Sequence, residues 1–195
     1  MTPEVYKVLI IGPPNVGKTS IVTRFTESEF EESYAPTVGL NVKISRIELP
    51  EGQVTMTVMD LGGQDAFDEL RRGYYRGAHY VIFLYDMTDA STFANIPRWY
   101  EKMCEEVFAE TGGFFPGAIV ANKADLADIR TIETDRGKQL ATLLNLDYFE
   151  TSARTGENVS ELFIHAASQC HIRIFGASGI DRTEVTRKTS IFDGL

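Results

Sequence analysis

The sequence predicts an α/β fold: a mostly parallel sheet of six strands, with helices on both faces and one antiparallel strand at an edge. Short apolar segments alternate with segments of helical periodicity, which is typical of a parallel sheet whose strands are connected by helices. Two apolar segments are separated by Pro-Glu-Gly at 50–52, a turn sequence that predicts a hairpin and therefore one antiparallel pair. The length of 195 residues suits a single domain.

Each predicted strand is a short apolar or partly alternating segment. Residues 80–85 are continuously apolar, as expected for a strand that is covered on both faces. Residues 40–49 and 54–60 alternate partially between apolar and polar side chains, which suits a pair nearer the edge of the sheet. In chain order the six predicted strands are 6–11, 40–49, 54–60, 80–85, 118–121 and 148–150.

Helical spacing predicts the connecting elements at 17–26, 92–109 and 134–145. In a last helix, apolar residues recur at helical spacing from Val159 to Ile174, and this stripe indicates packing against the core. From residue 176 onward the periodicity stops and glycine, serine, threonine and charged residues dominate. We therefore expect one domain over residues 1–175 and a disordered tail over 176–195.

Composition and charge exclude several classes of protein. Acidic residues outnumber basic ones by 28 to 19, for a formal net charge of −9, which argues against binding to nucleic acid or to an anionic membrane surface. The N-terminal residues lack the pattern of a signal peptide, and no apolar segment has the length of a membrane span. The two cysteines, Cys104 and Cys170, are interpreted as reduced thiols, although sequence alone leaves a disulfide open. These features predict a cytoplasmic protein.

A phosphate-binding loop is predicted directly after the first strand. Residues 12–19, GPPNVGKT, match the pattern G-x-x-x-x-G-K-[ST] and lead into the first predicted helix. Glycines let backbone N–H groups converge on phosphate oxygens, and the helix N-terminus adds positive potential. Lys18 can reach the β- and γ-phosphates, and the Thr19 hydroxyl can ligate Mg²⁺. The predicted nucleotide contacts are Gly12, Asn15, Val16, Gly17, Lys18, Thr19 and Ser20. The pattern by itself predicts a phosphate site, which kinases, ATPases and GTPases share.

A guanine-selecting loop is predicted at 122–125, at the end of a strand, where α/β sheets place their ligands. The Asp125 carboxylate can accept hydrogen bonds from N1–H and from the exocyclic amine of guanine. Adenine offers neither donor and would leave a buried carboxylate unpaired, which is how a site rejects an analogue strongly. Residues 152–154 follow the next strand, where a backbone N–H can complete the base pocket. The predicted base contacts are Asn122, Lys123, Asp125, Ser152, Ala153 and Arg154.

With these loops in this order and spacing, the chain resembles the Ras-like small GTPases over residues 6 to about 175. Motifs at 36–39, 74–78, 85–88, 91–93 and 150–159 resemble the Rab branch in particular. The resemblance implies a P-loop GTPase domain that binds GTP and GDP, hydrolyses GTP slowly with Mg²⁺, and acts as a switch. It also implies a function in vesicle or membrane trafficking.

The resemblance assigns roles to further residues. Thr37 would ligate Mg²⁺ together with Thr19, and Asp60 would hold the ion through a water molecule. Gln64 would orient the attacking water as the catalytic residue. Three further nucleotide contacts would come from Phe30, Tyr34 and Gly63.

Two loops would respond to the γ-phosphate and change conformation when it is lost. An exchange factor, a GTPase-activating protein and effectors would bind through residues 31–39 and 61–76. No lipid-modification signal of the Rab or Arf type is visible at either terminus, so we expect that a membrane, if reached, is reached through a partner.

The chain departs from the Rab pattern at three places. Residues 61–65, LGGQD, resemble the Arf branch. Val42 and Met59 replace two aromatic residues that Rab proteins usually carry, which predicts an unusual partner-binding surface. Pro14 has no N–H to donate within the phosphate loop, but we expect hydrolysis to survive.

Three alternatives remain open. Residues 14–18 also resemble the bacterial Era-type GTPases, whose next motif, Asp-Thr-Pro-Gly, is not matched at 60–63. A nucleotide-stabilised adaptor that rarely cycles would agree with the altered residues between the two switch loops, although it has little use for Gln64. A P-loop kinase of small molecules would leave residues 122–125 unexplained.

Overall fold

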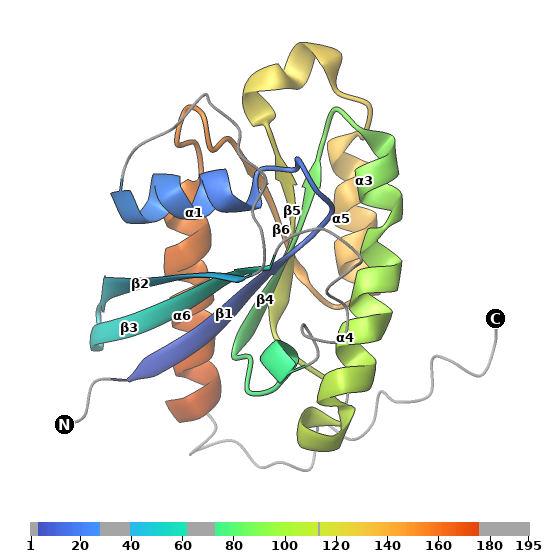
Figure 1. The fold of residues 1–195 in the computed structure, drawn as a ribbon. Coiled ribbons are helices and arrows are strands. Elements are labelled where there is room, and N and C mark those ends of the chain that lie inside the picture. The colour runs from blue at the N-terminus through green and yellow to red at the C-terminus, as the bar shows by residue number, and fades with distance from the viewer. Residues whose placement is uncertain (1–3, 28–39, 62–72, 113, 176–195) are drawn as a thin grey trace.

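The computed structural model of the chain describes residues 4–27, 40–61, 73–112 and 114–175. A six-stranded sheet forms its centre, in the order β2-β3-β1-β4-β5-β6 (Figure 1). Among the strand pairs of these described ranges, only β2–β3 is antiparallel, with Leu40 opposite Leu61 and Leu49 opposite Gly52, so the predicted edge strand is confirmed. The strands are β1 (Val5–Ile11), β2 (Leu40–Leu49), β3 (Gly52–Leu61), β4 (Tyr80–Asp86), β5 (Gly117–Asn122) and β6 (Asp147–Thr151).

Helices cover both faces of this sheet, as predicted. One face carries α1 and α6, and the other carries α3, α4 and α5 (Figure 1). A short 3₁₀ segment, η2, follows β5. The bounds of these elements are α1 (Lys18–Glu27), α3 (Ala90–Ala94), α4 (Ile96–Thr111), η2 (Ala124–Ile129), α5 (Thr134–Leu143) and α6 (Val159–Phe175).

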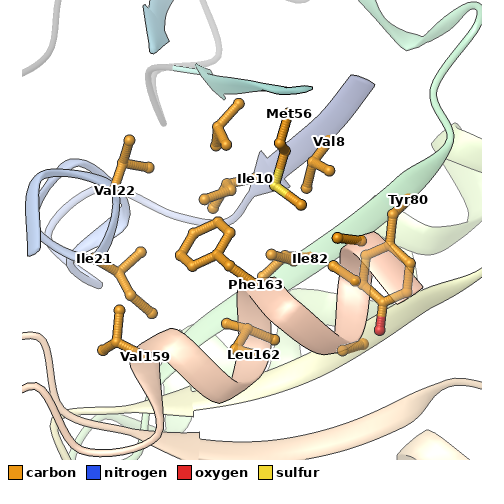
Figure 2. Close-up of a cluster of buried hydrophobic side chains, with 14 of the residues drawn as sticks. Val8, Ile10, Ile21, Val22, Met56, Tyr80, Ile82, Val159, Leu162 and Phe163 are labelled. Carbon is orange, nitrogen blue, oxygen red and sulfur yellow. The ribbon is translucent and has the colours of Figure 1, made fainter. Parts of the chain in front are cut away.

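Alternate residues of the central strands enter two separate cores. Val8 and Ile10 of β1 pack with Phe163 of α6 on one side (Figure 2). Leu9 of β1 packs with Trp99 of α4 on the other side. Because successive strand residues point to opposite faces, a strand buried on both faces is apolar throughout. All seven residues of β4 are buried, which agrees with its continuous apolar sequence.

The predicted helix at 92–109 is two helices. Asp89 caps α3, its side chain accepting a hydrogen bond from the Ser91 backbone N–H, and Asn95 ends that helix. The next helix, α4, begins at Ile96, so Pro97 falls in its first turn. Proline is tolerated there, because the first N–H groups of a helix have no partner within the helix, whereas in a helix interior it would remove a hydrogen bond. The break therefore follows from a proline that the periodicity does not register.

The two cysteines lie on opposite faces of the sheet. Cys170 is buried in the core under α6, and Cys104 packs against the core under α4. Both are free thiols, which confirms the interpretation from sequence. Among the helices of the described ranges, none has the length and apolar character needed to cross a bilayer.

The strands that run parallel to β1 all end at the same edge of the sheet. The loops after β1, β5 and β6 carry the predicted phosphate- and base-binding motifs, and β3 ends near Asp60. The topology thus gathers segments more than a hundred residues apart in sequence. Several predicted features lie outside the described residues: the tail at 176–195, and Phe30, Tyr34, Thr37, Gly63 and Gln64.

Candidate functional site

Two glycines shape the loop between β1 and α1. A Cβ atom on Gly12 would lie 2.3 Å from the carbonyl oxygen of Leu84, so no side chain fits there. Gly17 has φ of +95°, and a Cβ on it would lie 2.4 Å from Nδ2 of Asn122. Asn15 also adopts positive φ, at 67°. This backbone is the tight turn that a phosphate-binding loop requires, and it places the N-terminus of α1 at the edge where the strands end.

Lys18 is bonded into the loop that it follows. Its ammonium group donates to the carbonyl oxygens of Gly12 at 3.0 Å and of Pro13 at 2.7 Å. The side chain is nearly buried, with 6% of the residue exposed. The positive charge is therefore held beside the loop backbone, where phosphate oxygens are predicted to bind. Ser20, also in the first turn of α1, is half-buried.

Thr19 and Asp60 form the second part of the site. The Thr19 hydroxyl donates to Oδ2 of Asp60, which is fully buried at the end of β3. Oδ1 of the same carboxylate is buried and has no hydrogen-bond partner among the described residues. Burial raises the pKa of Asp60, and the opposing effects of the Thr19 hydrogen bond and the Lys18 charge are smaller. A hydroxyl and a buried carboxylate oxygen are the hard oxygen ligands that Mg²⁺ prefers, so these residues fit a magnesium ion.

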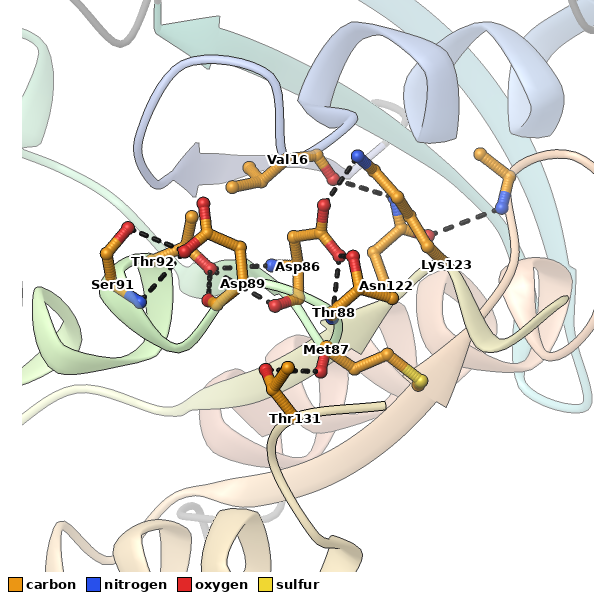
Figure 3. A network of polar contacts seen from close by, with 11 residues as sticks. Val16, Asp86, Met87, Thr88, Asp89, Ser91, Thr92, Asn122, Lys123 and Thr131 are labelled. Atoms are coloured by element: carbon orange, nitrogen blue, oxygen red, sulfur yellow. Dashed lines mark hydrogen bonds and ion pairs between the residues drawn. The ribbon is translucent and has the colours of Figure 1, made fainter. Parts of the chain in front are cut away.

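Asn122 links the phosphate loop to both base-binding loops. Its side-chain N–H donates to the Val16 carbonyl at 2.8 Å (Figure 3). Its Oδ1 accepts from the Thr151 hydroxyl at 3.2 Å and from the Ala153 backbone N–H at 3.3 Å. The residue is 1% exposed, so all of these bonds are shielded from water. Asn122 thereby fixes the relative position of three loops that come from distant parts of the sequence.

The predicted guanine-reading carboxylate lies against the loop after β6. Ser152 donates its hydroxyl hydrogen to Oδ1 of Asp125 at 2.6 Å and accepts from the Thr155 backbone N–H at 3.1 Å. The Arg154 guanidinium lies 4.0 Å from Oδ2 of Asp125. The arrangement orients a carboxylate in the first turn of η2 at the edge where the strands end.

Lys123 depends on an acidic residue that the sequence did not identify as part of the site. Its backbone is left-handed, with φ of 69°, and its Nζ lies 2.5 Å from Oδ2 of Asp86 (Figure 3). Oδ1 of Asp86 accepts from the backbone N–H and the hydroxyl of Thr88, at 2.8 and 2.7 Å. An aspartate that ends a strand of buried apolar residues is the sequence signal that could have found it.

Arg24 of α1 is a second residue that the sequence did not identify. Its Nε donates to the Ala153 carbonyl at 2.8 Å, and its Nη2 donates to the Arg154 carbonyl at 2.5 Å. The helix that opens at the phosphate loop is thus bonded to the loop after β6. An arginine on a helix is ordinarily interpreted as part of a solvated face, so no local signal points to this contact.

The structure brings the described candidates together at one edge of the sheet. Contact between these residues and a nucleotide remains a prediction. The candidates in question are Gly12, Asn15, Val16, Gly17, Lys18, Thr19, Ser20, Asp60, Asn122, Lys123, Asp125, Ser152, Ala153 and Arg154.

Known proteins resemble this chain over nearly all of its length. Residues 7–172 match the family model described as the Ras family. The GTP-binding protein ypt1 of Schizosaccharomyces pombe is 34% identical over 177 residues, which cover 89% of this chain and 85% of the relative. The Ras-related protein SEC4 of Candida albicans is 31% identical over 194 residues, which cover 95% of this chain and 90% of the relative. The matched family segment runs from β1 into α6 and includes every loop of the site.

Proposed function

Because the chain belongs to the Ras family of small GTPases, on its Rab branch, we propose that the loops at this edge of the sheet form its guanine-nucleotide site. The protein is a GTP-binding switch that hydrolyses GTP to GDP, and its partners are guanine nucleotides, regulators and effectors. The observation that carries the proposed site is Asn122, which bonds the phosphate loop and the loop after β6 at once.

In this proposal Asp125 is the residue that selects guanine. Its carboxylate is oriented by the Ser152 hydroxyl at 2.6 Å and is close enough to be attracted by Arg154. A carboxylate held in this way accepts the two N–H groups that guanine presents on one edge. Opposite adenine it would gain neither of these bonds, and it is costly to remove water from a carboxylate without replacing the lost hydrogen bonds.

The loop after β1 and the end of β3 are proposed to bind the phosphates and Mg²⁺. Lys18 would contact the β- and γ-phosphates, and Thr19 with Asp60 would hold Mg²⁺, together with Thr37. Bound Mg²⁺ would neutralise part of the charge on the phosphate oxygens. Gln64 would orient a water whose oxygen attacks the γ-phosphorus while the bond to the bridging oxygen breaks.

The switch itself is proposed to reside in residues 31–39 and 61–76. Thr37 and Gly63 would both bond an oxygen that is present in GTP and absent in GDP, so its loss releases both segments. An exchange factor, an activating protein and effectors would bind there. We place the switch in vesicle or membrane trafficking. A cytoplasmic protein recruited to membranes by a partner agrees with the formal net charge of −9.

Single-turnover hydrolysis tests this proposal against an adaptor that binds nucleotide without cycling. Protein loaded with GTP and Mg²⁺ should convert it slowly to GDP, and a Gln64→Leu variant should be slower by at least about tenfold. Both proteins should bind GTP with similar affinity. Stable GTP in the wild-type protein, at the same level as in the variant, would favour the adaptor.

A further inference from the structure

A half-buried ion pair, Arg130 with Glu150, lies on the segments that carry the two base-binding loops. Arg130 follows the last residue of η2, whose first turn carries Asp125. Glu150 lies in β6, two residues before Ser152. The pair therefore joins the two segments whose ends carry the hydrogen bond between Ser152 and Asp125.

The contact between the two side chains is a bidentate fork. Nη1 of Arg130 donates to Oε1 of Glu150 at 2.8 Å, and Nη2 donates to Oε2 at 2.7 Å. Such parallel bonds fix the relative orientation of the two groups as well as their distance. A lysine at this position would supply charge without that fork.

Two hydroxyls complete the coordination of the carboxylate. Thr134, at the start of α5, donates to Oε1 of Glu150 at 2.6 Å, and Tyr148 donates to the same oxygen at 2.8 Å. The Arg130 and Glu150 side chains are 15% and 23% exposed. Hydrogen bonding by Arg130 lowers the pKa of Glu150 to about 2, against the effect of burial. The pair is thus charged and oriented over the whole physiological pH range.

The segment that Arg130 anchors is not one continuous helix. Leu126, inside η2, has φ of −106° and ψ of 32°, which is outside helical geometry, so η2 is interrupted by a kink. Backbone hydrogen bonds close both ends of η2, from the Leu126 N–H to the Lys123 carbonyl at 2.9 Å and from the Arg130 N–H to the Ala127 carbonyl at 3.2 Å, but the kink separates the two turns. The position of Asp125 then depends on contacts at the two ends of η2.

We propose that Arg130 and Glu150 are positioning residues for guanine recognition, which hold η2 against β6 so that Asp125 faces the base at the correct angle. This inference rests on the proposed guanine site. The backbone from Asp125 to Arg130, the ion pair, the strand from Glu150 to Ser152 and the Ser152–Asp125 hydrogen bond make a closed ring. Opening the ring at the ion pair frees the Asp125 carboxylate to turn away from its two guanine donors.

The experiment compares GDP with inosine diphosphate, which lacks the exocyclic amine that Asp125 is proposed to bond. Dissociation rates of both nucleotides are measured for wild type, Arg130→Met, Arg130→Lys and Glu150→Gln, at a temperature where all are folded. If the Asp125 carboxylate becomes mobile, binding of GDP should weaken more than binding of inosine diphosphate, because GDP presents two N–H donors to it and inosine diphosphate presents one. Arg130→Met should release GDP about tenfold faster and inosine diphosphate only about twofold faster, so the preference for GDP falls about fivefold.

Arg173→Met is the matched control, because it removes another arginine, whose hydrogen bond to the Phe114 carbonyl lies at the opposite end of the sheet. It should leave the preference for GDP unchanged even if it lowers Tm. Arg130→Lys should be intermediate, since it keeps the charge without the fork. If Arg130→Met does not fold, Glu150→Gln provides the test, because glutamine keeps the side-chain volume and one acceptor oxygen. It should likewise lower the preference for GDP over inosine diphosphate.

Equal acceleration of both nucleotides, or none, would reduce the pair to a structural contact and overturn the inference. Wild-type protein that binds no guanine nucleotide would instead overturn the proposed site. The two failures are therefore distinguishable in the same set of measurements.

Discussion

The side-chain amide of Asn122 donates to the Val16 carbonyl over 2.8 Å, which bonds the loop after β5 directly to the phosphate loop after β1 (Figure 3). The same amide also lies close to Gly17, the next residue after Val16. A Cβ on Gly17 would meet Nδ2 of Asn122 at 2.4 Å. The sequence of the phosphate loop and the amide of Asn122 are thus matched sterically as well as by hydrogen bonding.

Replacing Asn122 by alanine should uncouple the loops. The Val16 carbonyl, the Thr151 hydroxyl and the Ala153 N–H all lose a buried partner. We expect a loss of about 1–3 kcal/mol in the free energy of unfolding and at least about tenfold in GDP affinity. Fluorescence titration with labelled GDP measures the affinity. Asn95→Ala is the control, since Asn95 bonds the Ser91 carbonyl on an exposed surface; equal affinities of the two variants would contradict the coupling.

Gly17→Ala should be more damaging than Gly52→Ala. Both residues have positive φ, of 95° and 134°, so both substitutions strain the backbone. A Cβ at Gly52 meets nothing within 4 Å, whereas one at Gly17 collides with Asn122. We expect Gly17→Ala to lower the free energy of unfolding by about 1–3 kcal/mol more than the control, and to reduce nucleotide binding. Urea unfolding of both variants provides the comparison, and equal losses would argue against the steric match.

Asp86→Asn should accelerate nucleotide release. The substitution removes the charge that lies 2.5 Å from Lys123 and keeps an oxygen for Thr88 to bond. Lys123 then loses the contact that orients it, and GDP should dissociate about tenfold faster in a chase with unlabelled nucleotide. Asp89→Asn changes a carboxylate that caps α3 on the surface and should leave the rate unchanged. If GDP dissociates at the same rate from both variants, Asp86 does not orient Lys123 for nucleotide binding.

Asp60→Asn should abolish the effect of Mg²⁺ on nucleotide release. Chelating Mg²⁺ should release GDP faster from wild-type protein, because Thr19 and Asp60 would no longer be linked to the phosphates through the ion. The variant should release GDP fast with or without Mg²⁺. Asp128→Asn, at an exposed position of η2, should behave as wild type. A variant at Asp60 that keeps the full response to chelation would place the ion elsewhere.

Acid should weaken the fold partly through Glu150. Its pKa is lowered from the ordinary 4.5 to about 2 in the folded protein. As the pH falls below about 4.5, the unfolded chain binds this proton first, so the contribution of Glu150 to stability is complete above that pH and is lost toward pH 2. Unfolding by urea at a series of pH values should show a shallower loss below pH 4.5 for Glu150→Gln than for wild type. Parallel curves would contradict the lowered pKa.

Much of the fold was predictable because its signals are local. The turn at 50–52 and the continuous apolar segment at 80–85 identify the hairpin and β4 without further information. The division between α3 and α4 was not predicted, since it depends on Pro97 falling in a first turn rather than in a helix interior. The kinked segment η2 was also missed, because it has no periodicity to detect.

Candidate site residues could be predicted where a motif lies on one segment, and they could not be predicted where a contact joins two segments. The phosphate loop and residues 122–125 are such motifs. Asp86, Arg24 and the Arg130–Glu150 pair were not identified as site residues, because each acts on a residue far away in sequence. In the sequence these residues cannot be distinguished from charged surface residues, because only the folded topology brings them close to the loops.

The central claim is that these loops form a guanine-nucleotide site that holds Mg²⁺. The most direct test is to denature the purified protein, identify the released nucleotide by chromatography, and measure Mg²⁺ in the same sample. We predict GDP or GTP at nearly one molecule per chain, with Mg²⁺ in similar amount. Release of adenine nucleotide, or of no nucleotide together with no affinity for added GTP, would contradict the claim.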